Sequence, residues 1–133
     1  MVFTFWTLGH DLKTSLVPQA LHQAIEYRSP QPGLLHHSDR GCQYASTDYR
    51  RQLHSLKALP SMSVAGNCYN NAAMESFWSA LKTESLHPQH FNTHHQARQA
   101  LVDYIETFYN PKRLHSALGY RSPVDFELIN RDA

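Results

Sequence analysis

Two acidic residues, Asp39 and Glu75, are the side chains of this sequence best placed to meet a ligand, and 35 residues lie between them. Asp39 follows the short apolar run of residues 34–37, which predicts a strand. Open α/β sheets bind ligands at the carboxyl ends of their strands, so a carboxylate at this position is suited to binding. An Asp beside Arg40 and Gly41 is also typical of a simple turn, so position alone does not assign a role.

Glu75 lies on a predicted helix that begins near Asn71 and carries an apolar face, formed by Met74, Phe77, Trp78 and Leu81. It is rotated by about 100° from Met74, toward the edge of that face. A carboxylate there borders the core and can still reach a cleft. By periodicity alone, Glu75 equally fits a solvated flank of the helix.

The other elements of the N-terminal half alternate between strand and helix. The run VFTFWTL, residues 2–8, predicts a strand buried on both faces. A helix with Thr14 as its N-cap is expected next, and a second helix is expected to begin near Ser46 or Thr47. Residues 61–64 predict another short strand.

In the C-terminal half, Thr93 and Gln96 form a capping-box pattern for a long helix that Pro111 ends. The tail of residues 112–133 is polar, and we expect it to be mostly irregular. The whole order of elements is typical of an α/β fold.

Composition sets limits on the class of protein but does not indicate a partner. The chain has 133 residues, 41% of them hydrophobic, which suffices for one domain with a core. Its formal charge of +1 gives no general argument for nucleic acid. The two cysteines, Cys42 and Cys68, do not make a disulfide scaffold. No stretch is long and apolar enough to span a membrane, so we expect a cytoplasmic setting.

Three strings carry a resemblance to a known family: HSDRGCQY around Asp39, GNCYNNAAMESFWSALKTE around Glu75, and YIETFYNPKRLHSALGYRSPVDFE over residues 104–127. With 35 residues between the two acids, they resemble the second and third acidic positions of the DDE signature of retroviral-type integrases and bacterial transposases. More narrowly, the chain resembles the transposases of the IS3 family of insertion sequences. The resemblance runs from about Trp6 to Glu127.

This resemblance implies a ribonuclease H-like (integrase core) fold and metal-dependent phosphoryl transfer on DNA. In the family, clustered carboxylates hold two divalent ions, Mg²⁺ or Mn²⁺, which suit hard oxygen ligands. One ion activates the attacking water or DNA 3′-hydroxyl, and the other stabilises the leaving oxygen. By resemblance, Asp39 and Glu75 are both catalytic residues and metal ligands.

The first Asp of the DDE signature has no counterpart here, because in the family it lies further upstream of the second than the 38 residues that precede Asp39. Asp11 lies in a predicted loop and does not suit that role. The string FTFWTLGHDLKTSLVPQAL resembles the third strand and the following helix of the family. We therefore expect an incomplete fold without the first two strands, which leaves unpaired strand edges and exposed apolar surface. Asn70 stands where the family usually has Asp, which alters the local charge.

Several basic residues are candidate contacts to DNA phosphates. Lys82 lies two helical turns after Glu75, on roughly the same side. His37 stands close to Asp39 at the expected active edge. The tail adds Lys112, Arg113 and Arg121. Each of these is also typical of an ordinary solvated surface.

The histidine pairs, residues 36–37 and 94–95, do not favour zinc. Neighbouring side chains on a strand point to opposite faces, so such a pair is not a chelate. Tyr109 and Tyr120 could stack on bases, although packing in the core or at its rim explains them as well.

We expect residues 1–88 to form a partial ribonuclease H-like integrase catalytic core, and residues 89–133 the C-terminal helix and tail of the same domain.

The expected reaction is DNA strand cleavage and 3′-hydroxyl strand transfer, by a truncated transposase that is inactive alone and, as a fragment, marginally stable. Its partners would be DNA and full-length transposase, with oligomerisation in the complete enzyme and a two-metal site formed only there. Two alternatives remain: a catalytically dead remnant that binds DNA or full-length transposase, and a ribonuclease H-type nuclease.

Overall fold

The computed structural model describes residues 6–10, 15–38, 42–62 and 72–131. They fall into two compact units, one within Phe5–Ser76 and one within Phe77–Ala133. The order of helices and strands is α1, β1, α2, β2, α3, α4 and α5, with short 3₁₀ and π segments between several of them. The units, here called the N-terminal and C-terminal units, are described separately below. Within the described segments, no helix is long and apolar enough to cross a membrane.

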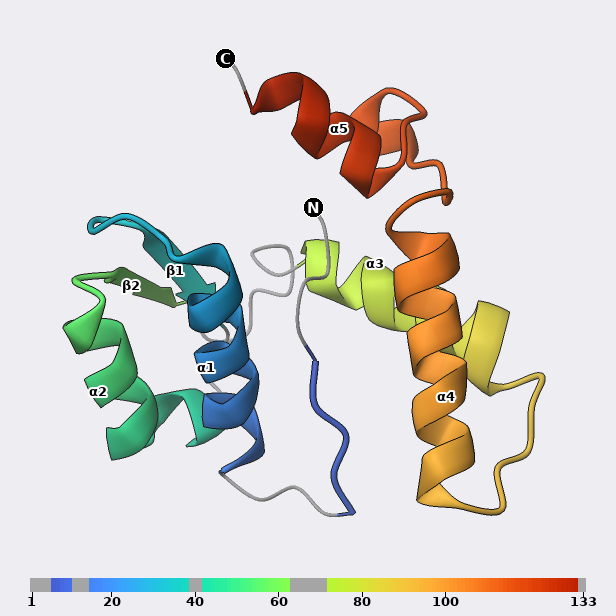
Figure 1. Ribbon diagram of the computed structural model, residues 1–133, viewed down its shortest axis with the longest axis horizontal. Coiled ribbons are helices and arrows are strands. Elements are labelled where there is room, and N and C mark those ends of the chain that lie inside the picture. Colours follow the sequence, from blue (N-terminus) through green and yellow to red (C-terminus); the bar gives the residue numbers. More distant parts are fainter. Residues whose placement is uncertain (1–5, 11–14, 39–41, 63–71, 132–133) are drawn as a thin grey trace. The chain divides into compact units, whose positions relative to one another are not determined.

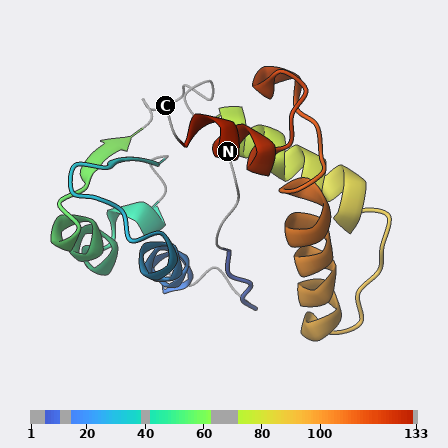
Figure 2. The same ribbon diagram turned by 45° about the horizontal axis from the view of Figure 1, so that its top comes forward.

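The N-terminal unit contains a parallel pair of strands with two helices on one side of it (Figures 1 and 2). The strands are β1, Leu35–Ser38, and β2, Leu59–Met62. Leu35 pairs with Leu59, and Ser38 pairs with Met62. The connection between the two strands contains a 3₁₀ turn, Cys42–Ala45, and helix α2, Thr47–Ser55. A strand–helix–strand unit of this kind is the usual way to join neighbouring parallel strands, and it confirms the predicted α/β character.

Helix α2 and helix α1, Leu16–Arg28, enclose the small core of this unit. Ser46 is the N-cap of α2, and its hydroxyl accepts the N–H of Tyr49 over 3.4 Å, as the sequence predicts. Tyr49 and Leu53 occupy successive turns of one helix face and are buried. Side chains of α1 and of the loop before β2 complete the core; they include Val17, Leu21 and Ala58.

The C-terminal unit is helical. It takes in the second half of α3, Ala72–Leu81, followed by a π segment, Lys82–Leu86. Helix α4, His94–Tyr104, comes next and continues as a π segment, Ile105–Tyr109. A 3₁₀ turn, Ser116–Leu118, leads to α5, Pro123–Asn130. In both views α3 lies beside α4 (Figures 1 and 2). The core between them is formed by Phe77, Leu81, Leu101, Tyr104, Ile105 and Tyr109.

The predicted N-cap of α4 is confirmed. The Thr93 hydroxyl accepts the N–H of Gln96 over 3.1 Å, and the Gln96 side chain accepts the N–H of Asn92 over 2.9 Å. The long helix ends at Tyr109, directly before Asn110 and Pro111, as predicted, because Pro111 has no N–H with which to continue the helical hydrogen bonds.

Two predictions of secondary structure are wrong in the part of the chain that the structure describes. Residues 6–8 of the expected strand 2–8 are not a strand; the Thr7 hydroxyl instead donates to the carbonyl of Leu16 at the start of α1. Residues 2–5 of that prediction, like Thr14, lie outside the described residues. The tail is not irregular, because Ser122 caps α5 and Pro123 occupies its first turn, which is a favourable helix start.

The apolar face predicted for α3 is only partly buried. Phe77 and Leu81 are 4% and 1% exposed, whereas Trp78 is 49% exposed. A helix places Trp78 about 100° from Phe77, so the buried stripe is narrower than the spacing of apolar residues suggests. Phe108, in the π segment that continues α4, is also exposed, at 42%.

Candidate functional site

Strand β1 leads directly to Asp39, the first residue of the predicted acidic site. β1 ends at Ser38, and Asp39 is the next residue, outside the described part of the chain. Ser38 is buried and pairs with Met62 of β2, so pairing fixes the backbone that leads into Asp39. The carboxyl ends of β1 and β2 lie at the same edge because the strands are parallel.

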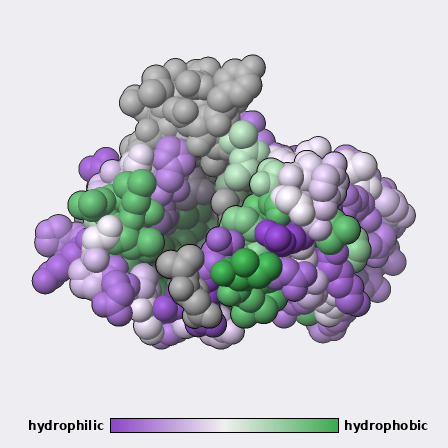
Figure 3. Space-filling view, turned by 90° about the horizontal axis from the view of Figure 1, so that it is seen from above, coloured by the Kyte–Doolittle hydropathy of each residue, from purple (hydrophilic) through white to green (hydrophobic). Residues whose placement is uncertain are grey.

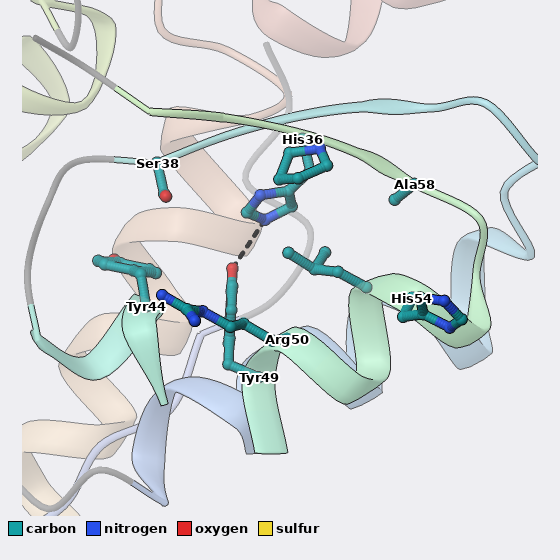
Figure 4. Close-up of a pocket in the computed structure, with 9 residues that line it drawn as sticks. His36, Ser38, Tyr44, Tyr49, Arg50, His54 and Ala58 are labelled. Atoms are coloured by element: carbon teal, nitrogen blue, oxygen red, sulfur yellow. Dashed lines mark hydrogen bonds between the residues drawn. The ribbon is translucent and has the colours of Figure 1, made fainter. Parts of the chain in front are cut away.

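A hydrogen bond between a tyrosine and a histidine ties β1 to α2. The Oη atom of Tyr49 lies 2.7 Å from Nε2 of His36, and the two rings meet edge to face (Figure 4). Burial raises the pKa of Tyr49, so its hydroxyl stays protonated and donates. Burial also lowers the pKa of His36, which favours the neutral ring that can accept. The contact therefore holds β1 three residues before Asp39.

Next to this hydrogen bond is a pocket of about 520 Å³ between the strands and α2 (Figure 4). Tyr44 packs edge to face against Tyr49, with ring centroids 5.4 Å apart, and forms one wall. The Arg50 side chain lies near Tyr44, while His54 stands further along α2 (Figure 4). The remaining lining residues are Ser38, Leu53, Ala58 and Pro60.

The two adjacent histidines of β1 face opposite sides, as predicted. His36 points toward α2 and Tyr49, whereas His37 is exposed, with its Nδ1 atom 3.1 Å from the Ser61 hydroxyl of β2. The face that carries His37 also carries Leu35 and Leu59, which are 65% and 58% exposed. Figure 3 shows hydrophobic side chains in patches on the surface. This outer sheet face therefore combines apolar and polar side chains.

Glu75 lies in the first turn of α3 and is exposed. Met74 beside it is half-buried and Phe77 is buried, so Glu75 occupies the flank of the helix, as its spacing predicts. No hydrogen bond or ion pair involves its carboxylate within the described segments. The structure thus gives Glu75 an accessible carboxylate and does not describe its distance from Asp39.

A second acidic residue on the continuation of this helix, Glu84, is surrounded by donors. Arg113 donates through Nε to both carboxylate oxygens over 3.1 and 3.0 Å, and through Nη2 to Oε1 over 2.7 Å. The Tyr104 hydroxyl donates to Oε2 over 2.6 Å. The Arg113 hydrogen bonds hold the pKa of Glu84 below its usual value. Burial and then the bond to Glu84 raise the pKa of Tyr104.

Aromatic rings complete the environment of Arg113. Its guanidinium carbon lies 5.7 Å from the centre of the Tyr109 ring, a cation–π distance. The Tyr109 ring also meets His115, with centroids 5.0 Å apart, and burial lowers the pKa of His115. Tyr109 is 5% exposed, which agrees with the packing alternative for this residue rather than with base stacking.

Most of the other predicted DNA contacts of the C-terminal unit have exposed side chains. Lys82 follows α3 directly and is exposed, and so are Lys112 and Arg121 in the tail. Tyr120 is 73% exposed beside Arg121. Arg113 differs from these residues because its side chain is 28% exposed and paired with Glu84. In the described residues, which exclude Asp39, no three His, Cys, Asp or Glu side chains converge to hold a metal ion.

Two of these features were not predicted from the sequence. The Tyr49–His36 bond joins residues 13 apart, and the Arg113–Glu84 pair joins residues 29 apart. Neither separation matches a helical or strand repeat, so local patterns contain no signal for them. The helical spacing of Leu101, Tyr104 and Ile105 indicates a buried face, but it does not indicate the carboxylate that Tyr104 binds.

Comparisons with known proteins agree with the strings noted in the sequence. Two family models described as Integrase core domain match residues 2–68 and residues 56–123. The chain is 46% identical over 125 residues to the transposase for insertion sequence element IS904 of Lactococcus lactis subsp. lactis (strain IL1403), covering 94% of this chain and 49% of that protein.

Two further relatives give the same picture. An insertion element IS600 uncharacterized 31 kDa protein of Shigella sonnei is 46% identical over 121 residues, which cover 91% of this chain and 44% of that protein. Transposase InsF for insertion sequence IS3A of Escherichia coli (strain K12) is 39% identical over 125 residues, covering 94% of this chain and 43% of that protein. The chain spans about half the length of the curated relatives it matches.

The two matches to the integrase core together extend over most of the sequence, and each includes half of it or slightly more. An integrase core implies a ribonuclease H-like α/β fold, with which the parallel β1–β2 pair and its helices are consistent. The chain therefore belongs to the integrase core family, and within it to the relatives of IS3-type insertion-sequence transposases.

Proposed function

We propose that this chain serves DNA transposition by metal-dependent phosphoryl transfer, and that Asp39 and Glu75 are its metal ligands. The integrase core match carries this proposal. Two placements support it: Asp39 directly follows the carboxyl end of β1, and Glu75 presents an exposed carboxylate on α3. The reaction would be strand cleavage followed by attack of a DNA 3′-hydroxyl on a target strand.

The donor set fits a hard divalent cation. Asp39 and Glu75 both offer carboxylate oxygens, which Mg²⁺ and Mn²⁺ prefer over nitrogen or sulfur. Such ions activate a water or hydroxyl nucleophile and neutralise charge on the leaving oxygen. The residues of the chain hold and orient this site: pairing with β2 fixes the end of β1, and the Tyr49 hydroxyl fixes His36 on the same strand.

DNA would be bound by exposed basic side chains. Lys82 follows Glu75 by two helical turns, which puts it on the same side of the helix. Lys112 and Arg121 are exposed basic residues of the tail, and His37 stands on β1 two residues before Asp39. Because each basic side chain that binds a phosphate releases counterions, neutralising one of them should reduce the salt dependence of DNA binding by roughly one unit of slope.

We infer further that a polypeptide of only these 133 residues is inactive, because it supplies two of the three acidic positions in the DDE signature. The test is to incubate it with Mg²⁺ or Mn²⁺ and a labelled element end, and to look for nicking and strand joining. Activity that Asp39→Ala or Glu75→Ala abolishes, and that the exposed control Glu106→Ala retains, would confirm both ligands and refute inactivity. Activity that survives both ligand substitutions would refute the metal site.

Metal binding tests the ligands even without turnover. Mn²⁺ titrated into the chain should bind more weakly after Asp39→Asn or Glu75→Gln, and unchanged after Glu106→Gln. The alternative, a remnant that binds DNA or a full-length transposase, predicts binding without metal-dependent cleavage. It is favoured if the chain retains a labelled duplex, or lowers transposition by a co-expressed relative, while both ligand substitutions leave that effect unchanged. Cleavage of RNA in an RNA–DNA hybrid would instead indicate a ribonuclease H-type nuclease.

A further inference from the structure

Arg113 and Lys112 are neighbours in the tail, yet the structure gives their side chains different environments. Lys112 is exposed, whereas the Arg113 guanidinium forms a bidentate pair with Glu84, in which the two side chains are 28% and 35% exposed. Tyr104 donates to the same carboxylate. We call Glu84, Tyr104, Tyr109 and Arg113 the Glu84 cluster.

We propose that Arg113 is a positioning residue, which holds the tail against the helix through Glu84 and does not itself bind a DNA phosphate. The inference rests on the proposed DNA-binding function, since it concerns how the exposed tail residues Lys112 and Arg121 are presented. It replaces the sequence-based assignment of Arg113 as a phosphate contact.

The hydrogen bonds of Arg113 leave little capacity for a phosphate. Its Nε and Nη2 atoms are used by Glu84, and one face of the guanidinium lies over Tyr109. Bidentate pairs of this geometry are among the stronger charge-assisted hydrogen bonds. A phosphate at the remaining nitrogen would also lie close to the Glu84 carboxylate, and like charges at such a distance repel.

The backbone of the tail is tied to the same region at several points, so the effect of Arg113 extends along it. The N–H groups of Lys112 and Arg113 both donate to the carbonyl of Phe108. His115 pairs with Arg121 in an isolated antiparallel bridge. The N–H of Val124, at the start of α5, donates to the carbonyl of Asn110 over 3.0 Å. Within this folded segment, the Arg113 side chain links the tail to the helix that carries Glu84.

Charge reversal separates the two roles. Glu84→Arg raises the net charge by two, because a positive side chain replaces a negative one. The double variant Glu84→Arg, Arg113→Glu restores both the pairing and the original net charge. If Arg113 positions the tail, the double variant binds duplex DNA more tightly than Glu84→Arg, despite its lower positive charge. If Arg113 contacts phosphate, or if charge alone governs affinity, Glu84→Arg binds at least as tightly as the double variant.

The measurement is fluorescence anisotropy with a labelled duplex at several salt concentrations. We expect Glu84→Arg and Arg113→Glu to weaken binding by about five-fold or more, and the double variant to recover to within about two-fold of the unsubstituted chain. The control Lys112→Gln should lower the salt slope by roughly 0.9 without loss of tail structure. Equal or tighter binding by Glu84→Arg than by the double variant overturns the proposal.

Hydrogen–deuterium exchange provides a readout that needs no DNA. Amides of residues 112–130 should exchange faster in Glu84→Arg and Arg113→Glu, and at the original rate in the double variant. Unchanged exchange in the single variants overturns the positioning role, whatever the DNA result. If the unsubstituted chain binds no duplex while exchange follows the expected pattern, the proposed DNA function fails and the link between tail and helix stands.

Discussion

Tyr49→Phe removes the hydroxyl that joins α2 to β1, and we expect its cost to depend on pH. Tyr49 is 3% exposed and donates to His36 over 2.7 Å. The phenyl ring keeps the edge contacts to His36 and Tyr44, at centroid distances of 5.5 and 5.4 Å, so packing is nearly unchanged. The substitution therefore isolates one hydrogen bond.

The expected loss at about pH 8 is about 1 to 2 kcal/mol of unfolding free energy. A net hydrogen bond contributes about 1 kcal/mol, and a buried acceptor left without a donor costs about 1–3 kcal/mol. Because His36 is only partly buried, water replaces some of the interaction that the hydroxyl provided. We therefore expect a loss of unfolding free energy at the low end of these figures, about 1 to 2 kcal/mol.

Acidification should reduce this difference. The pKa of His36 is lowered in the folded chain, so the unfolded chain takes up a proton first as the pH falls below 6.5. The contribution of neutral His36 to the unfolding free energy is thus present above pH 6.5 and is lost below it. Burial still lowers the pKa of His36 in Tyr49→Phe, but the neutral ring has lost the hydroxyl donor that favours it, so protonation of the folded variant costs less. The variant loses less stability on acidification, and its difference from the unsubstituted chain shrinks.

Urea unfolding followed by circular dichroism at about pH 8 and about pH 5.5 measures the two differences, and a midpoint shift of roughly 0.5–1 M is expected at the higher pH. Hydrogen exchange of residues 47–62 assigns the change to the N-terminal unit. Tyr120→Phe is the control, because Tyr120 is 73% exposed. An equal loss at both pH values, or no loss at either, would contradict the assigned donor and acceptor.

Three further predictions concern the C-terminal unit. Ser122→Ala removes the N-cap of α5 and should cost about 1 kcal/mol, measured by urea unfolding. Leu81→Ala, at a 1% exposed site, should cost about 3 kcal/mol, whereas Trp78→Ala on the exposed side should cost much less. The pKa of Glu84 is lowered by Arg113, so its stabilisation is present above pH 4.5 and is lost below it; Arg113→Gln should flatten this acid limb of the stability profile.

Local hydrogen-bonding patterns explain why much of the fold could be predicted. Ser46 caps α2, and Thr93 caps α4, because short polar side chains satisfy the free N–H groups at a helix start. β2 begins at Leu59, two residues before the predicted strand, because its register is set by pairing with β1 rather than by its own sequence. The start of α5 at Ser122 and Pro123 follows the same capping rule, so the expectation of an irregular tail missed an available signal.

Tertiary contacts explain what could not be predicted. The exposure of Trp78 depends on which neighbours pack on α3, and helix periodicity gives only the direction of the side chain. Residues 6–8 have strand-forming side chains, but a strand requires a partner, and the described residues provide Thr7 with a contact to Leu16 instead. Arg113 looks like Lys112 in sequence, and only the folded chain reveals that it has Glu84 as a partner.

The two glutamates on α3 and its continuation, Glu75 and Glu84, differ in their hydrogen-bond partners. A carboxylate that accepts hydrogen bonds from Tyr104 and from two nitrogens of Arg113 must give up several charge-assisted bonds before it can bind a cation. Glu84 is therefore poorly suited to be a metal ligand, and its role is to hold the tail. Glu75 has no such bonds among the described residues and is exposed. If the family site uses a carboxylate from this helix, Glu75 is favoured, because it can bind a cation without first breaking such bonds. A Mn²⁺ affinity that falls with Glu84→Gln but not with Glu75→Gln would reverse that assignment.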